Sequence, residues 1–214
     1  AFPKNKTTDE AWLQSEMMGA GKTAIDHKIP VFCPELSVKN QIKAALKDTE
    51  ESNDEIEAIF GYFIFRNLGS CQQEGETTQE RLRPHINTFN RASKNEYTLT
   101  DVLNIGKQLF GENFKLSPDY LKSIEKELNT LSCPTGFPYG PKEHLSIDPD
   151  SGIAKKIRQV PHIVRRHRDG NILREIRNIV ECGKHRHISI IFGKNHYTDY
   201  QERGLLKLKR HYEK

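Results

Sequence analysis

Apolar side chains recur at helical spacing over much of this chain. Residues 37–47, 54–68 and 102–109 each place apolar side chains at every third or fourth position. Such spacing is typical of amphipathic helices, because 3.6 residues complete one turn. The aromatic run at 61–65 is also compatible with a strand, but the longer pattern around it favours a helix.

Local signals place the ends of several helices. Thr100 is expected to cap the helix that contains residues 102–109, and Gly111 is expected to stop it. The Ser-Pro-Asp sequence at 117–119 opens the next helix, with proline in the first turn.

Near the C-terminal end, two separate helices are expected over residues 153–164 and 169–182. Pro161 kinks or shortens the first of them, because proline lacks the amide that a helix interior uses.

Two short apolar runs predict buried strands. Residues 29–33 follow a helical segment, and residues 188–192 are apolar at successive positions, as in a parallel strand that is covered on both faces. Helices that alternate with such strands predict an α/β fold, in which a mainly parallel sheet holds both runs and is flanked by helices.

The middle of the chain is expected to be a helical insertion or cap over about residues 70–152. Its joints are polar at 71–80 and rich in proline and glycine at 133–152, so both are expected to be mobile connections. With 214 residues and 24.7 kDa, the chain suits a single domain, residues 1–214.

Composition narrows the functional classes only slightly. The net charge of +4 and the pI near 8.8 are too mildly basic to indicate nucleic acid without a clustered patch. Four cysteines without paired spacing favour a reducing compartment, hence the cytoplasm. No stretch is apolar enough to span a membrane. The chain begins at Ala1 rather than Met, so secretion stays open.

Gly21-Lys22-Thr23 has the ending of a phosphate-binding loop. The motif needs a further glycine five positions before Gly21, where Glu16 stands, and it should follow a strand. The segment is therefore expected to be a closely packed helix and not a nucleotide site.

Four side chains are candidates for catalysis. Glu35 and His196 follow the two predicted strands, and the carboxyl ends of parallel strands open on one crevice. Histidine suits a general base, and Glu35 would orient it. Glu16, on a helix expected over residues 7–24, would activate water or hold a divalent cation. Arg168, before the expected helix cap Asp169, would stabilise a developing oxyanion or bind a substrate carboxylate. An exposed loop histidine, solvated carboxylates and a basic solvated helix face are the structural alternatives.

In their order, Glu16, residues 29–35, the Arg168-Asp169 pair and Gly193-x-x-His196 resemble the TraB, TIKI, ChaN and erythromycin-esterase superfamily. The resemblance implies a parallel sheet flanked by helices. It also implies hydrolysis of an ester or peptide substrate, with metal dependence proposed for some members. Mixed histidine and carboxylate ligands would suit Mn, Zn or Fe. The family's first strand, with its own G-x-x-H or G-E-x-H, is not among these residues.

Two other functions are left open. One is a non-catalytic binding domain of the same fold. The other is a nucleic-acid-binding protein with a phosphate-facing basic patch, although the expected partner is a small molecule or peptide rather than nucleic acid. The patch would consist of Lys155, Lys156, Arg158, Arg165, Arg166 and Arg168.

Overall fold

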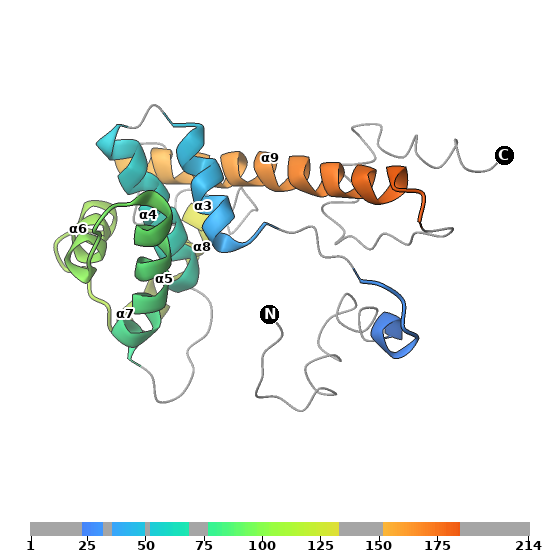
Figure 1. The fold of residues 1–214 in the computed structure, drawn as a ribbon. Helices are drawn as coiled ribbons and strands as arrows, with labels where there is room; N and C mark the ends of the chain where they lie inside the picture. Colours follow the sequence, from blue (N-terminus) through green and yellow to red (C-terminus); the bar gives the residue numbers. More distant parts are fainter. Residues whose placement is uncertain (1–22, 32–35, 50–51, 69–76, 133–151, 185–214) are drawn as a thin grey trace. The chain divides into compact units, whose positions relative to one another are not determined.

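The computed structural model describes residues 23–31, 36–49, 52–68, 77–132 and 152–184, and the regular elements in these ranges are helices (Figure 1). They are α3 (Val38–Lys47), α4 (Asn53–Leu68), α5 (Thr78–Ser93), α6 (Leu99–Phe110), α7 (Pro118–Ser123), α8 (Glu125–Ser132) and α9 (Gly152–Glu181). The chain divides into two units, of which Glu35–Glu175 is one and Ala1–Pro34 with Ile176–Lys214 is the other.

The α/β fold predicted from the sequence is wrong, because the described residues are helical and contain no strand. The first predicted strand is described at residues 29–31, where it is not extended in a sheet. The Ile29 amide donates to the Ala24 carbonyl at 2.8 Å and so closes a short helix. Ile29 and Val31 stay 57% and 52% exposed, so this apolar run is not a buried strand. The second predicted strand, 188–192, lies outside the described residues.

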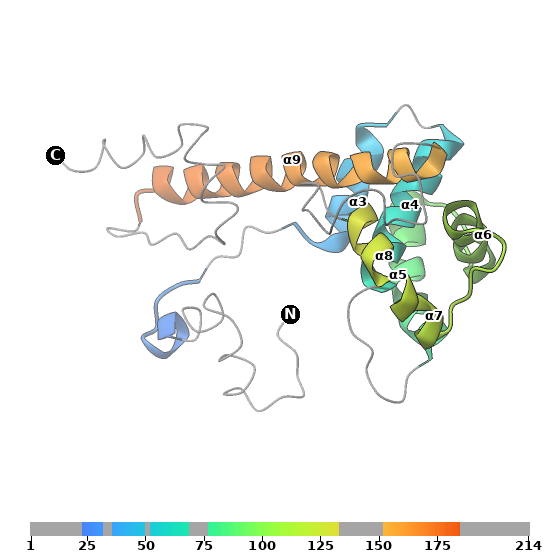
Figure 2. The same ribbon diagram turned by 180° about the vertical axis from the view of Figure 1, so that it is seen from behind.

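Helix α4 is the central element of the Glu35–Glu175 unit. It packs against α3, α5, α6 and α8, and both ribbon views show it among these helices (Figures 1 and 2). Every residue from Ala58 to Phe65 is buried. A helix that is surrounded by others needs apolar side chains all round, which explains the aromatic run. The helix predicted over residues 54–68 is thereby confirmed.

Aromatic rings fill the space around α4. The Phe60 ring stacks on Tyr97 with centroids 4.2 Å apart and meets Phe89 edge-on at 5.1 Å. Near the C-terminal end of α4, the ring of Phe65 contacts the ring of Phe114, which Phe110 also contacts. Ring pairs in these offset and edge-on geometries contribute about 0.5–1.5 kcal/mol each beyond the area that they bury.

Side-chain caps define the starts of α5 and α6. The Thr77 hydroxyl accepts the Glu80 amide at 3.2 Å, and the Glu80 carboxylate accepts the Thr77 amide at 2.9 Å. Helix α5 therefore begins inside the region predicted as a loop. In α6 the cap is Thr98 and not Thr100, because the Asp101 carboxylate reaches back to the Thr98 amide at 2.6 Å.

The predicted stop at Gly111 and the start of a helix at Pro118 are confirmed. The middle of the chain is helical as expected, but it is not a cap over a sheet. In the part of the chain that the structure describes, α5 and α8 pack directly on α4 and complete its core. Of the two expected mobile joints, residues 71–76 and 133–151 lie outside the described residues.

The two helices predicted at the C-terminal end are one continuous helix, α9, with Pro161 in its interior. A proline in a helix interior costs about 3 kcal/mol or more. Ile157, Val160 and Val164 surround it in sequence and are at most 3% exposed within the core. Burying each such side chain contributes about 1.5–3 kcal/mol, so packing outweighs the proline.

Candidate functional site

The predicted catalytic residues are not brought together in the described structure. Glu16, Glu35 and His196 lie outside the described residues, so their convergence stays a prediction. Arg168 is described and is half-buried in the middle of α9. The sequence predicted that Asp169 opens a helix, but Asp169 lies in the interior of α9. It is 2% exposed, and its carboxylate lies 3.8 Å from the Arg165 guanidinium one turn earlier.

Helix α9 carries the positive charge of this protein. It contains eight Lys and Arg residues against three Asp and Glu residues, a net charge of +5. The whole chain has a net charge of +4, so the remaining residues together carry −1. The small net charge of the whole chain therefore conceals a strong excess of positive charge in α9. An anion-binding surface requires such clustering of positive charge.

In the part of α9 that belongs to the Glu35–Glu175 unit, the solvent-facing side is a row of basic and uncharged residues, which we call the α9 row. Its spacing of three or four residues places the members on one face of the helix. None of them is acidic, and the row from Lys155 to Arg174 is about 28 Å long at 1.5 Å per residue. The exposed members are Gly152, Lys155, Gln159, His162, Arg166, Gly170 and Arg174.

Two cations of the row remain open to solvent although they have partners in the protein. The side chains of Arg166 and Arg174 are 69% and 67% exposed. Arg174 donates to Asn171 through one nitrogen and lies 3.6 Å from Glu175 through another. An arginine has five N–H donors, so such contacts leave donors for a ligand.

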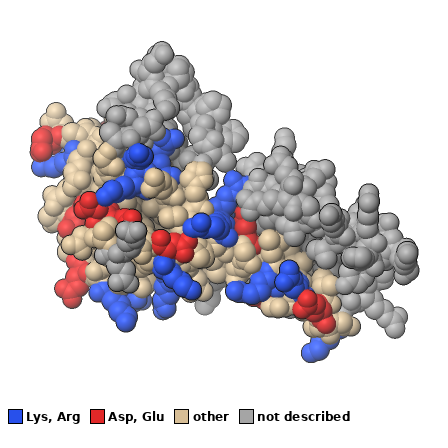
Figure 3. Space-filling model, turned by 90° about the horizontal axis from the view of Figure 1, so that it is seen from above, with Lys and Arg blue, Asp and Glu red and all other residues tan. Residues whose placement is uncertain are grey.

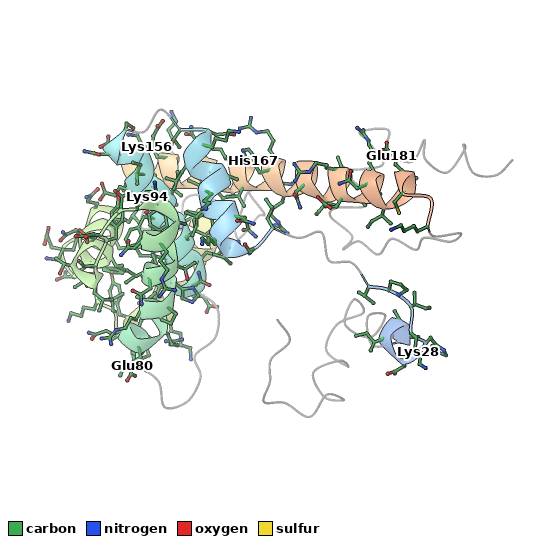
Figure 4. All side chains as sticks on the ribbon, viewed as in Figure 1. Lys28, Glu80, Lys94, Lys156, His167 and Glu181 are labelled. Carbon is green, nitrogen blue, oxygen red and sulfur yellow. The ribbon has the colours of Figure 1, made fainter. Side chains whose placement is uncertain are left out.

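Ion pairs also join α9 to the ends of the helices beneath it. Lys156 donates to Asp54 at the start of α4 at 2.8 Å. Near the middle of α9, Arg166 and His167 lie 2.5 and 2.9 Å from the same Asp48 oxygen, at the end of α3. Figure 4 labels Lys156 and His167 on α9.

His167 and Arg166 both affect the pKa of the Asp48 carboxyl. Burial acts to raise its pKa, but the hydrogen bonds and charges of His167 and Arg166 outweigh burial and lower the pKa below its ordinary value. Asp48 is thus a carboxylate at neutral pH and balances one positive charge on α9.

A second polar group lies between α4 and α6. Burial, followed by the charge of Asp54, raises the pKa of the Glu57 carboxyl, whereas the Gln108 amide donates to it at 3.5 Å and acts to lower it. Burial also raises the pKa of Tyr97, with Glu57 adding to the effect. The charge of Asp54 thus favours the neutral form of Glu57, and the charge of Glu57 favours the neutral form of Tyr97.

Sequence reasoning had named six of the eight basic residues of α9, without Arg174 and Arg177, and had missed the acids that pair with them. Asp48 lies 118 positions from Arg166, and Asp54 lies 102 positions from Lys156. Neither partnership has a local sequence signal.

Among the described residues, no group of three or more His, Cys, Asp or Glu side chains could hold a metal ion. The divalent metal expected from the sequence therefore remains a prediction. None of the helices in the described ranges combines the length and the apolar character that crossing a bilayer requires.

Comparison with known proteins adds no assignment, because no family model, curated protein or solved structure matches this chain.

Proposed function

We propose that this protein is a helical nucleic-acid-binding protein whose α9 row contacts the phosphate backbone. The observation that carries the proposal is the concentration of charge: α9 has a net charge of +5, and its solvent-facing row has no acidic member. Phosphate contacts by Lys and Arg supply most of the sequence-independent affinity for nucleic acid. Figure 3 shows Lys and Arg side chains spread over one face of the molecule, with acids between them.

The geometry suits the backbone of a nucleic acid better than a small anion. A single phosphate or carboxylate would be held by cations that converge on one point, whereas Lys155, Arg166 and Arg174 are spread along about 28 Å of helix. A duplex presents one charge per about 1.7 Å of its axis, so an extended row meets several phosphates at once.

Salt dependence of binding tests the proposal. Three phosphate contacts predict that the logarithm of the association constant falls with the logarithm of salt concentration with a slope of about −2.7. Affinity for a labelled duplex should then fall by about fortyfold between 50 and 200 mM salt. Fluorescence anisotropy measures it, and affinity that is independent of salt would contradict the proposal.

A matched pair of variants separates the row from net charge. Replacing Lys155, Arg166 and Arg174 by Gln should flatten the salt slope and weaken binding on the order of 10²-fold at 0.1 M salt. The control replaces three exposed cations on other helices by Gln and changes the net charge by the same amount; they are Arg83, Arg91 and Lys122. If the control weakens binding equally, the α9 row is not the site.

As part of this proposal we place the protein in the cytoplasm, in line with its scattered cysteines. Cys182, at the end of α9, is a free thiol in the structure. The hydrolase hypothesis stays a prediction, and hydrolysis of an ester or peptide that disappears on His196→Ala substitution would support it.

A further inference from the structure

Arg166 of the α9 row shares its acidic partner with a histidine. The Arg166 guanidinium and the His167 Nε2 atom both lie against Oδ2 of Asp48, at 2.5 and 2.9 Å. The side chains of His167 and Asp48 are 29% and 25% exposed, whereas that of Arg166 is 69% exposed. Arg166 thus faces solvent on one side and a carboxylate on the other.

The charge of this cluster depends on the protonation of His167. With a neutral imidazole, Asp48 and Arg166 sum to zero. With an imidazolium, the same carboxylate is shared by two cations, and the cluster carries +1. The charged groups that act on Asp48 are His167 and Arg166, both from α9, while Arg168 and Lys47 are their nearest charged neighbours along the chain.

We propose that Asp48 and His167 make nucleic-acid binding by the α9 row dependent on pH. When His167 is neutral, Asp48 competes with phosphate for Arg166. When His167 is protonated, it holds the carboxylate, and Arg166 is released to a phosphate. The inference rests on the proposed function, because the row must bind a polyanion for the competition to matter.

The size of the effect follows from one added charge. The slope of about −2.7 applies when all three cations contact phosphate. With Arg166 held by Asp48, two contacts remain, the slope is about −1.8, and the association constant is about five- to tenfold lower at 0.1 M salt. Histidine is the side chain whose charge ordinarily changes between about pH 5 and pH 8. Affinity should therefore rise as the pH falls from 8 to 5.5, which we would measure by anisotropy with a labelled duplex.

Three variants assign the pH dependence to this cluster. His167→Gln should keep the weak affinity of pH 8 at every pH. Asp48→Asn should bind about five- to tenfold more tightly than wild type at pH 8, because Arg166 has lost its competitor. His85→Gln is the control, because His85 is a histidine on α5, outside the row.

A second measurement checks the fold of the variants. Circular dichroism on each variant checks that the helices remain.

The outcomes separate this inference from the proposed function. Wild-type protein that shows no salt-dependent binding between pH 5.5 and 8 contradicts the function itself. Binding whose pH dependence persists in His167→Gln, or disappears only in His85→Gln, contradicts the inference and leaves the function standing. The same holds if Asp48→Asn binds no more tightly than wild type at pH 8.

Discussion

Two glycine-to-alanine substitutions should shift stability in opposite directions. Gly106 lies in α6 and Gly170 in α9, and both are interior positions of helices in the Glu35–Glu175 unit. A Cβ atom at Gly170 would have no neighbour within 4 Å. A Cβ atom at Gly106 would overlap the ring of Phe114, whose Cζ would be 2.6 Å away and whose Cε1 and Cδ1 would be closer still.

The Phe114 ring has little room to move away. It is 3% exposed and stacks on Phe110 with centroids 5.5 Å apart. The rings of Phe65 and Tyr120 both meet the Phe114 ring edge-on, with centroids 6.1 and 5.7 Å from it. Relief of the overlap must therefore displace several aromatic rings or the backbone of α6.

The expected magnitudes follow from two opposing effects. Alanine is favoured over glycine in a helix interior by about 1 kcal/mol, so Gly170→Ala should raise the free energy of unfolding by up to about that amount. Gly106→Ala has the same gain but also an overpacking cost of typically 1–3 kcal/mol, here toward the upper end. The two variants should thus differ by about 3 kcal/mol, with Gly106→Ala less stable than wild type.

Urea unfolding followed by far-ultraviolet circular dichroism measures both changes, provided that the slope m is the same in each variant. Phe114→Leu supplies the test of cause, because a smaller side chain makes room for the new methyl group. In a double-mutant cycle, Gly106→Ala should cost at least about 1 kcal/mol less in the Phe114→Leu background. If Gly106→Ala is as stable as Gly170→Ala, the described packing of α6 on Phe114 is wrong.

Two local predictions concern polar groups. Thr77→Ala should destabilise α5 by about 1 kcal/mol, whereas Thr100→Ala, which removes no cap, should change the urea midpoint little. The hydrogen bonds from Thr77 lower the pKa of Glu80, so their contribution is present above the ordinary carboxyl pKa and is lost as the pH falls through the lowered value. The gap between Thr77→Ala and wild type should therefore narrow below about pH 4, and a constant gap would contradict this cause. Asn90 bonds both the amide and the carbonyl of Tyr97, at 3.0 and 2.8 Å, so Asn90→Ala should cost about 1–3 kcal/mol in urea unfolding. Asn90→Asp keeps the acceptor alone and should cost less, so equal losses would show that the bond from the Tyr97 amide to this acceptor contributes nothing.

Several helices could be predicted from the sequence because their signals are local. Apolar spacing located α3 and α4, and Gly111 and Pro118 marked an end and a start. Helix caps act within three or four residues, so a short window of sequence contains the relevant partners. The error at Thr100 is of the same local kind, since the pairing of Thr98 with Asp101 was present in the sequence and was overlooked.

The fold class was not predictable in the same way. The run at residues 29–33 has the composition of a buried strand, but a strand also requires partners for its backbone and a cover for its faces. In the described residues Ile29 bonds within its own helical turn and stays exposed. The candidate catalytic site rests on the same reasoning, because Glu35 and His196 were placed at the ends of strands, and their convergence stays a prediction.

The sequence by itself determined where helices form and that α9 is basic, because periodicity, caps and charge are properties of neighbouring residues. Tertiary structure decided that α9 continues through Pro161, since only burial of Ile157 and Val164 in the core offsets the lost hydrogen bond. It also decided which cations face solvent and which acids they meet. Asp48 reaches Arg166 across 118 positions because packing brings the end of α3 to α9, and no local pattern encodes that contact.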